Sequence, residues 1–429
     1  MGYSFSGDIE LVELTLVSSL GKVIDISHIA MEINIYQSLF KHYLRCDVAI
    51  GDALNLGNLM EGIPDENVPG GWTGGERLIV SYRENTDPSN DSETPIKKHM
   101  FVLYEMSNRI KNNDFSEQYI IQGISLEAFV TIPQKIRKSY GGKKGNTIQN
   151  MVKSVVNEYI YPNPISDLYA KVNIRKTIVI DDTVGLQKYV IPSLTVDNTI
   201  DFLANEADSD SHYPYYMFYE DSEGFKFRNI PNILKDINQN KKELPTFFYF
   251  MSNYFEASDD EDVQFDDQYK IIDFSVDKTT NILDNVKYGL YKSKNIQLDI
   301  INKKTNTVVF DYTKEKDKFE SLQSGDFFGN VGSDDAIISL STQDNLRDKK
   351  NSFKRQIFNS TMKVSIPGDS SLNVGDIINL NFYINNTIIE DQGLDKQLSG
   401  KYIITSLRQK INQTIFTTLL DVSKDVSLI

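Results

Sequence analysis

Histidine and cysteine are the side chains that most often build metal or nucleophilic sites, and both are sparse in this 429-residue chain. Its histidines are His28, His42, His99 and His212, and their spacing matches no zinc site. The single Cys46 has no partner for an internal disulfide. We therefore predict no metal site, no cofactor and no disulfide.

An acidic cluster offers carboxylate oxygens, the ligands that calcium prefers. Asp259–Asp262 is followed closely by Asp266 and Asp267. The cluster lacks the central glycine and the terminal bidentate glutamate of a calcium loop. We therefore interpret it as a solvated loop.

Three further patterns could belong to an enzyme, but each is incomplete. The glycine-rich stretch 141–147 continues from Gly145 into Asn146 rather than into the lysine of a phosphate loop, so a basic turn before a helix explains it better. The stretch 123–127, centred on Ser125, lacks the closing glycine of a nucleophile elbow. Glu76 and Glu127 could form an acid/base pair, but nothing in the sequence brings them together. We predict no catalytic residue, and hence a protein that is not an enzyme.

Composition points to folded β structure. Hydrophobic residues make up 40% and aromatic residues 11%, and the 23 Tyr and 23 Phe favour sheet surfaces. The formal net charge of −15 argues against a surface that clamps nucleic acid, although it permits one that nucleic acid passes without binding. The N-terminus has only a loose match to a myristoylation pattern, Gly2 with Ser6, and no apolar run is long enough to span a bilayer. We expect no membrane anchor.

The elements that must position these residues are mostly strands. Alternating or apolar runs between turn residues predict strands at 22–27, 30–36, 46–50, 78–82, 100–111 and 117–124. Helical spacing predicts helices over 125–138, over 146–159, and from an N-cap at Thr195 or Asp197 to Ala207. A hairpin is expected over 213–230. Later strands are expected at 247–254, 269–276, 285–299, 307–312, 361–368, 372–380, 400–407 and 415–422, with a helix over 345–360.

These elements predict a mainly β fold with α insertions (β+α) and four segments. Residues 1–128 form a first antiparallel β-barrel domain, completed by 212–240. Residues 129–211 form a mostly helical insertion. Residues 241–312 and 342–425 form a second β-barrel domain, and 313–341 is a polar, irregular insertion of unknown role.

Several segments, taken together, resemble the central baseplate hub protein of contractile-tailed bacteriophages, which is related to the spike hubs of type VI secretion. The resemblance spans nearly the whole chain and rests on the order of short stretches. These are 24–27, 33–40, 75–80, 192–207, 218–228, 281–293, Asp299, 310–312, 366–368, 374–376 and 400–403.

The resemblance implies a specific architecture and role. Such hubs are homotrimers whose subunits each carry two tube-like barrels, so six similar barrels form a pseudo-sixfold ring. The ring joins the hexameric tail tube, or a tube-initiator protein, to the trimeric spike or needle, and it lines the DNA channel. The insertions would meet other baseplate proteins, and basic residues such as Lys143, Lys144, Lys349, Lys350 and Arg355 would lie away from the lumen. The protein would be made in the host cytoplasm and act in the virion.

Two alternatives stay open at the level of sequence. Tyr-rich β domains also bind sugars, and Trp72 in a Gly-rich loop could stack on a sugar ring, which would suit a carbohydrate-binding adhesin or receptor-binding tail module. A loop anchor packed on the barrel explains Trp72 better. The other alternative is the hub of a phage-derived contractile injection system.

Overall fold

The structure is a computed structural model. It describes residues 7–18, 21–53, 56, 74–84, 95–113, 116–142, 144–210, 213–240, 243–249, 269–279, 281–299, 303–315, 335–339, 346–383, 394–412 and 415–425. Among these residues, no helix is both long enough and apolar enough to cross a membrane.

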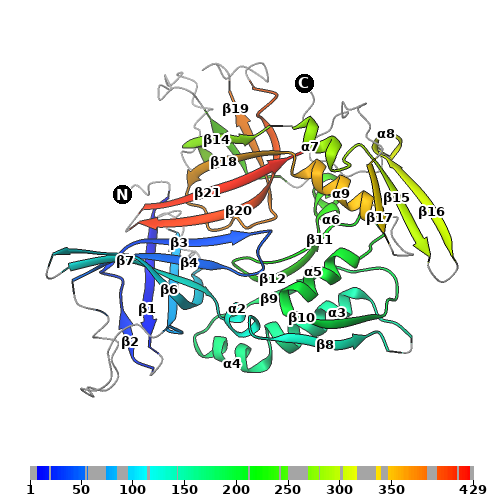
Figure 1. The fold of residues 1–429 in the computed structure, drawn as a ribbon. Coiled ribbons are helices and arrows are strands. Elements are labelled where there is room, and N and C mark those ends of the chain that lie inside the picture. Colours follow the sequence, from blue (N-terminus) through cyan, green and yellow to red (C-terminus); the bar gives the residue numbers. More distant parts are fainter. Residues whose placement is uncertain are drawn as a thin grey trace.

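A large, mostly antiparallel sheet dominates the described part of the chain (Figure 1). Its 13 strands follow the order β14-β18-β21-β20-β3-β4-β7-β6-β5-β1-β2, with β19 beside β20 and β13 beside β19. The N-terminal strands are β1 (Ile9–Val17), β2 (Val23–Asp25), β3 (Ala30–Ser38), β4 (Arg45–Asp52), β5 (Arg77–Glu84), β6 (Lys97–Asn113) and β7 (Ser116–Ser125). The later strands are β13 (Thr246–Tyr249), β14 (Asp273–Lys278), β18 (Ser360–Pro367), β19 (Ile377–Phe382), β20 (Gly400–Asn412) and β21 (Ile415–Lys424).

N-terminal and C-terminal strands of the chain are paired in the middle of this sheet. Strand β20 pairs antiparallel with β3, with Ile411 opposite Ile33 and Ser406 opposite Ser38. The expectation of two separate barrels therefore needs correction, because the described strands form one continuous sheet and no closed barrel. The reason is the length of β20 and β21, which run past the C-terminal unit and pack on the N-terminal one.

Each β unit nevertheless folds back on itself at one point. An isolated bridge joins Asp8, just before β1, to Ile415 at the start of β21. A second bridge joins Phe248 of β13 to Lys270, just before β14. The core of the N-terminal unit also contains Ile411 and Phe416 from the β20–β21 hairpin. The C-terminal hairpin thus completes the first unit, where the sequence suggested residues 212–240.

The segment expected to be mostly helical is a mixed α/β unit. It contains α2 (Leu126–Thr131), β8 (Lys135–Tyr140), α3 (Ile148–Val155), the π-helical turn η1 (Val156–Ile160), α4 (Asn163–Lys171), β9 (Thr177–Ile180), β10 (Tyr189–Thr195) and α5 (Val196–Glu206). The helix predicted over 125–138 is therefore wrong in its second half, where β8 pairs with β10. Ile136 and Tyr140 are buried four residues apart, a spacing that suits one face of a helix or of a strand equally.

The predicted hairpin forms as β11 (Tyr216–Glu220) and β12 (Gly224–Asn229). It does not join the large sheet, because β12 pairs in parallel with β9 in a separate three-stranded sheet. Phe218, Phe225 and Phe227 are buried in one core with residues of α3 and α5. These buried aromatic side chains hold the hairpin against the α/β unit.

The remaining elements lie beside the C-terminal unit, on its right in Figure 1. They are α6 (Ile230–Asn240), α7 (Ile282–Lys287), β15 (Lys292–Asp299), β16 (Lys304–Asp311), α8 (Tyr312–Glu315), β17 (Asp335–Ser339) and α9 (Leu346–Ile357). Strands β15, β16 and β17 form their own three-stranded sheet, so 285–312 does not extend the large sheet as expected. The polar segment 313–341 is not wholly irregular, since β17 pairs in parallel with β15.

Candidate functional site

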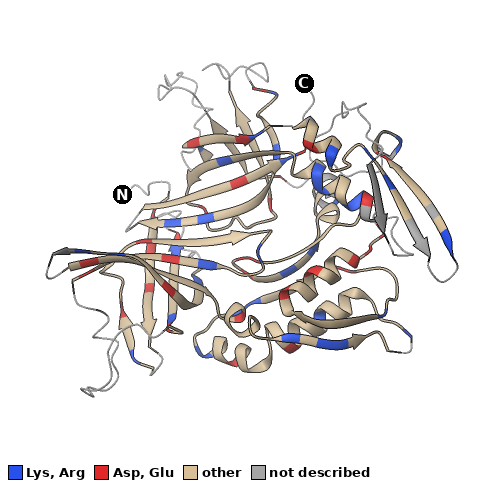
Figure 2. Cartoon of the chain, in the orientation of Figure 1, with Lys and Arg blue, Asp and Glu red and all other residues tan. Residues whose placement is uncertain are grey.

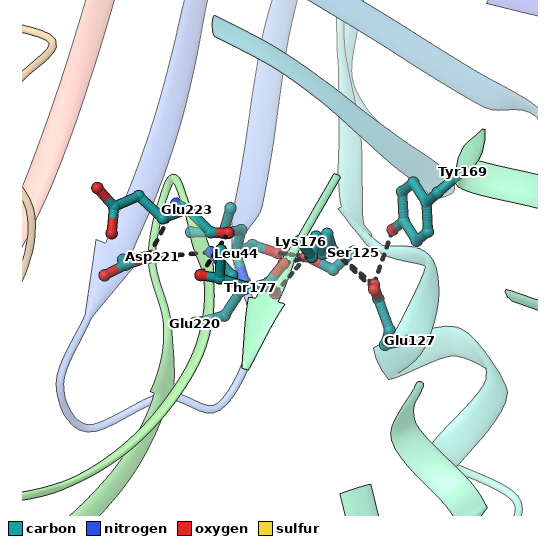
Figure 3. Close-up of polar contacts among 10 residues, drawn as sticks. Leu44, Ser125, Glu127, Tyr169, Lys176, Thr177, Glu220, Asp221 and Glu223 are labelled. Atoms are coloured by element: carbon teal, nitrogen blue, oxygen red, sulfur yellow. Dashed lines mark hydrogen bonds and ion pairs between the residues drawn. The ribbon is translucent and has the colours of Figure 1, made fainter. Parts of the chain in front are cut away.

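Among the described residues, a cluster of buried charged side chains lies where the large sheet meets the α/β unit (Figure 3). Lys176, just before β9, places its Nζ 2.8 Å from both carboxylate oxygens of Glu127 on α2. The same Nζ lies 2.6 Å from Oε1 of Glu220 at the end of β11. Both glutamate side chains are fully buried, and that of Lys176 is 11% exposed. One cation therefore bridges two carboxylates.

Neutral donors complete the cluster. The Tyr169 hydroxyl donates to Glu127 over 2.8 Å. The Ser125 hydroxyl and the Leu44 amide both donate to Oε2 of Glu220, over 2.6 and 3.0 Å. Because Leu44 and Ser125 belong to the large-sheet side of the junction, these bonds tie the sheet to the hairpin β11–β12.

The electrostatics keep the lysine charged. Burial lowers the pKa of Lys176, but the charges of Glu127 and Glu220 outweigh it and raise that pKa well above its usual value. Burial raises the pKa of Glu220, and the charge of Lys176 offsets part of this effect. Every polar group of the cluster is engaged by another, so the arrangement lacks a free nucleophile or base. Its chemistry is that of a structural ion-pair network.

A second polar contact joins the same two parts of the chain. His42, in the β3–β4 loop, places Nε2 2.9 Å from Asp201 and Nδ1 3.6 Å from Asp197, both on α5. Burial lowers the pKa of His42, but the hydrogen bonds and charges of the two aspartates outweigh it and raise that pKa to about 9. The Tyr43 hydroxyl donates to Asp197 over 2.8 Å. His42 is therefore a charged contact between the units.

The other candidate residues named from the sequence are packed in the core or bound to neighbouring side chains. Burial lowers the pKa of His99 to about 3, and its ring stacks on Tyr82 and Phe101. Ser125 ends β7 and donates to Glu220 rather than to a histidine. Gly142 and Lys144 lie in turns just before α3, and Thr147 accepts a hydrogen bond from the Asn150 amide at the start of that helix. No group of three or more His, Cys, Asp or Glu that could hold a metal occurs in the described residues.

Other predicted positions lie outside the described residues. They are Gly2, Ser6, Trp72, Lys143, His212, Asp259–Asp262, Asp266 and Asp267.

The sequence alone did not reveal that Glu127 belongs to a buried cluster with Lys176 and Glu220. Lys176 and Glu220 lie 49 and 93 positions further along the chain, and no local pattern links them to it. The one available signal was a charged residue ending an apolar run, since Glu220 follows Tyr216–Tyr219. A glutamate at that place is buried only if a cation reaches it.

Comparison with known proteins rests on the fold. No protein-family model matches the chain, and no curated protein matches it by sequence. Among solved structures, a tail protein from Neisseria meningitidis MC58 is similar with a TM-score of 0.54, 11% identity, and 96% of each chain covered. The 43 kDa tail protein of prophage MuSo2 from Shewanella oneidensis is similar with a TM-score of 0.53, 10% identity, and 96% of this chain and 98% of that chain covered. The chain has the fold of these tail proteins. The likeness covers nearly the whole of both partners, which confirms the resemblance at the level of the fold.

Proposed function

We propose that this protein is a structural subunit of a phage tail, the central hub of its baseplate. In this role three copies form a pseudo-sixfold ring that joins the hexameric tail tube to the trimeric spike and surrounds the path of the DNA. The proposal rests on the fold shared with phage tail proteins and on the way the β units are arranged in one chain.

The observation that carries the proposal is the pair of β units held side by side by β3 and β20. Each unit has its own buried core and one isolated bridge at which its sheet turns back. Two such units per chain let a threefold assembly present six similar β units. A protein that joins a sixfold tube to a threefold spike needs this match of symmetries.

The charges on the solvent side of the large sheet support a surface that DNA can pass. Arg408 and Lys410 of β20 both contact Glu32 of β3, over 3.1 and 2.9 Å. Lys363 of β18 contacts Asp277 over 3.1 Å. Figure 2 shows acidic and basic positions interspersed along these strands rather than gathered into a basic stripe. Paired cations are less available to phosphate groups, so a wall of this kind would retain DNA weakly.

The basic residues expected away from a lumen make contacts elsewhere. Lys350 of α9 donates over 2.6 Å to the backbone oxygens of Asn205 and Ala207 at the end of α5. Arg355 lies over the ring of Tyr288, 4.1 Å from its centroid. Their distance from a channel remains a prediction of the proposal.

Light scattering of the purified protein tests the assembly. We expect a particle of three times the chain mass of 48.9 kDa, alone or once a spike protein is added. A monomer at every concentration, with and without the spike protein, would contradict the hub role. A purified protein that hydrolyses peptidoglycan, and loses that activity on one carboxylate substitution, would contradict the non-enzymatic role.

A further inference from the structure

A groove of about 560 Å³ lies where the β3–β4 loop, α2, α5, β11 and α9 meet. Its floor is apolar and buried, with Ala204 and Met217 each 8% exposed and Phe218 4% exposed. Its rims expose two large apolar side chains, since Phe40 is 50% exposed and Ile132 is 64% exposed. Exposed apolar groups beside a preformed pocket are typical of a binding site. We name this cavity the junction groove.

The acidic and basic side chains that line the junction groove differ in whether they already have an ionic partner. Its carboxylates, Asp197 and Asp201, are already bound to His42. Its cations Lys41 and Lys354 are exposed, and neither forms an ion pair with a carboxylate in the described part of the chain. Arg45 adds a third exposed positive charge to the lining. The lining thus carries Lys41, Arg45, Lys354 and His42 against two carboxylates that share His42, so its excess of positive charge favours an anionic ligand.

We propose that the junction groove binds an acidic segment of a partner protein, with an aromatic or large aliphatic side chain of that segment seated on its floor. The inference deepens the proposed hub role, on which it rests, by placing a contact for a neighbouring tail protein on the α/β unit. A protein segment fits better than nucleic acid, because the open groove combines a buried apolar floor with a few separate cations, while DNA needs a row of cations along its backbone.

Binding of a defined peptide to the full chain tests the inference. The probe is a fluorescently labelled peptide of residues 254–268 of this chain, which combines a dense run of carboxylates with Tyr254, Phe255 and Phe265. We expect saturable binding by fluorescence anisotropy. The variant with both Lys41→Glu and Lys354→Glu should weaken that binding by about tenfold or more, since two attractive charges become repulsive.

Matched controls separate charge from non-specific association. Lys144→Glu, at an exposed position on the turn before α3, should leave binding unchanged. The same peptide with every Asp and Glu replaced by Asn and Gln should bind at least about tenfold more weakly. Absence of binding, or equal binding by the groove variant, would overturn the proposal.

Two other results would also overturn it. A DNA duplex that competes for the groove and binds more tightly than the peptide would assign the groove to nucleic acid. Loss of the trimer in the groove variant would assign it to a second copy. A trimer that persists while peptide binding fails would remove this inference and leave the hub role standing.

Discussion

Replacing Lys176 by methionine should destabilise the protein strongly. The lysine contacts two fully buried carboxylates, and the variant would remove this charge from both of them. Removing one member of a buried ion pair costs about 3–5 kcal/mol. The hydroxyl groups of Tyr169 and Ser125 still donate to the glutamates, which favours the lower end of this range.

Thermal unfolding followed by circular dichroism should measure the loss. We expect the midpoint to fall by roughly 3–6 °C at neutral pH, because the unfolding entropy of a chain of this length is about 0.9 kcal/mol/K. The loss should shrink as the pH is lowered towards 5. Burial raises the pKa of Glu220, and the variant lacks the lysine charge that offsets part of this effect, so the penalty applies above the pKa of the unfolded chain and disappears as the group is protonated.

Two further variants separate the ion-pair argument from a simple packing defect. Lys176→Met combined with Glu127→Gln and Glu220→Gln should recover much of the loss, because the buried charges are gone. Lys138→Met removes a lysine from a pair with Glu158 that is 39% and 44% exposed, and should cost less than about 1 kcal/mol. A midpoint within about 1 °C of the wild type for Lys176→Met, or a loss independent of pH, would refute the reasoning.

Three other predictions follow from single contacts. His42→Gln should reduce the free energy of unfolding by about 1–2 kcal/mol at pH 6 and by almost nothing above pH 9. The pKa of His42 is raised from 6.5 to about 9, so its positive charge stabilises the fold fully below pH 6.5 and this contribution is lost as the pH rises through 9. Equal midpoint shifts at both pH values would contradict this. Glu32→Gln should free its two basic partners and strengthen DNA binding in a salt-dependent way, measured by anisotropy with a duplex, whereas Glu158→Gln should not. Gly224→Ala should cost about 3 kcal/mol or more or prevent folding, since φ is +144° and the added Cβ would lie 2.1 Å from the backbone oxygen of Thr177; a soluble variant with the wild-type midpoint would show that the strand can shift.

Much of the local structure follows from short-range patterns. Helices α3 and α5 begin where the sequence predicts them, because Thr147 and Thr195 accept hydrogen bonds from the amides of Asn150 and Asn198. Strands such as β4 and β7 follow alternating runs, since one face of each is buried, whereas β5 is buried continuously from Leu78 to Tyr82. The mainly β fold class was accessible for the same reason, whereas the resemblance to phage baseplate hubs rested on the order of particular short stretches of sequence.

Only the tertiary structure determined which unit each element packs in and which strand it pairs with. Strand β8 could not be told from a helix, because its two buried residues suit both periods and only pairing with β10 selects the strand. The hairpin β11–β12 packs on the α/β unit through Phe218, Phe225 and Phe227, which are buried in the core of that unit. The charge cluster was equally invisible, since Lys176 meets residues 49 and 44 positions away, and Arg408 of β20 reaches Asn34 of β3 across 374 positions. A sequence determines local periodicity, but which distant partner neutralises a buried charge depends on chain packing that no local pattern encodes.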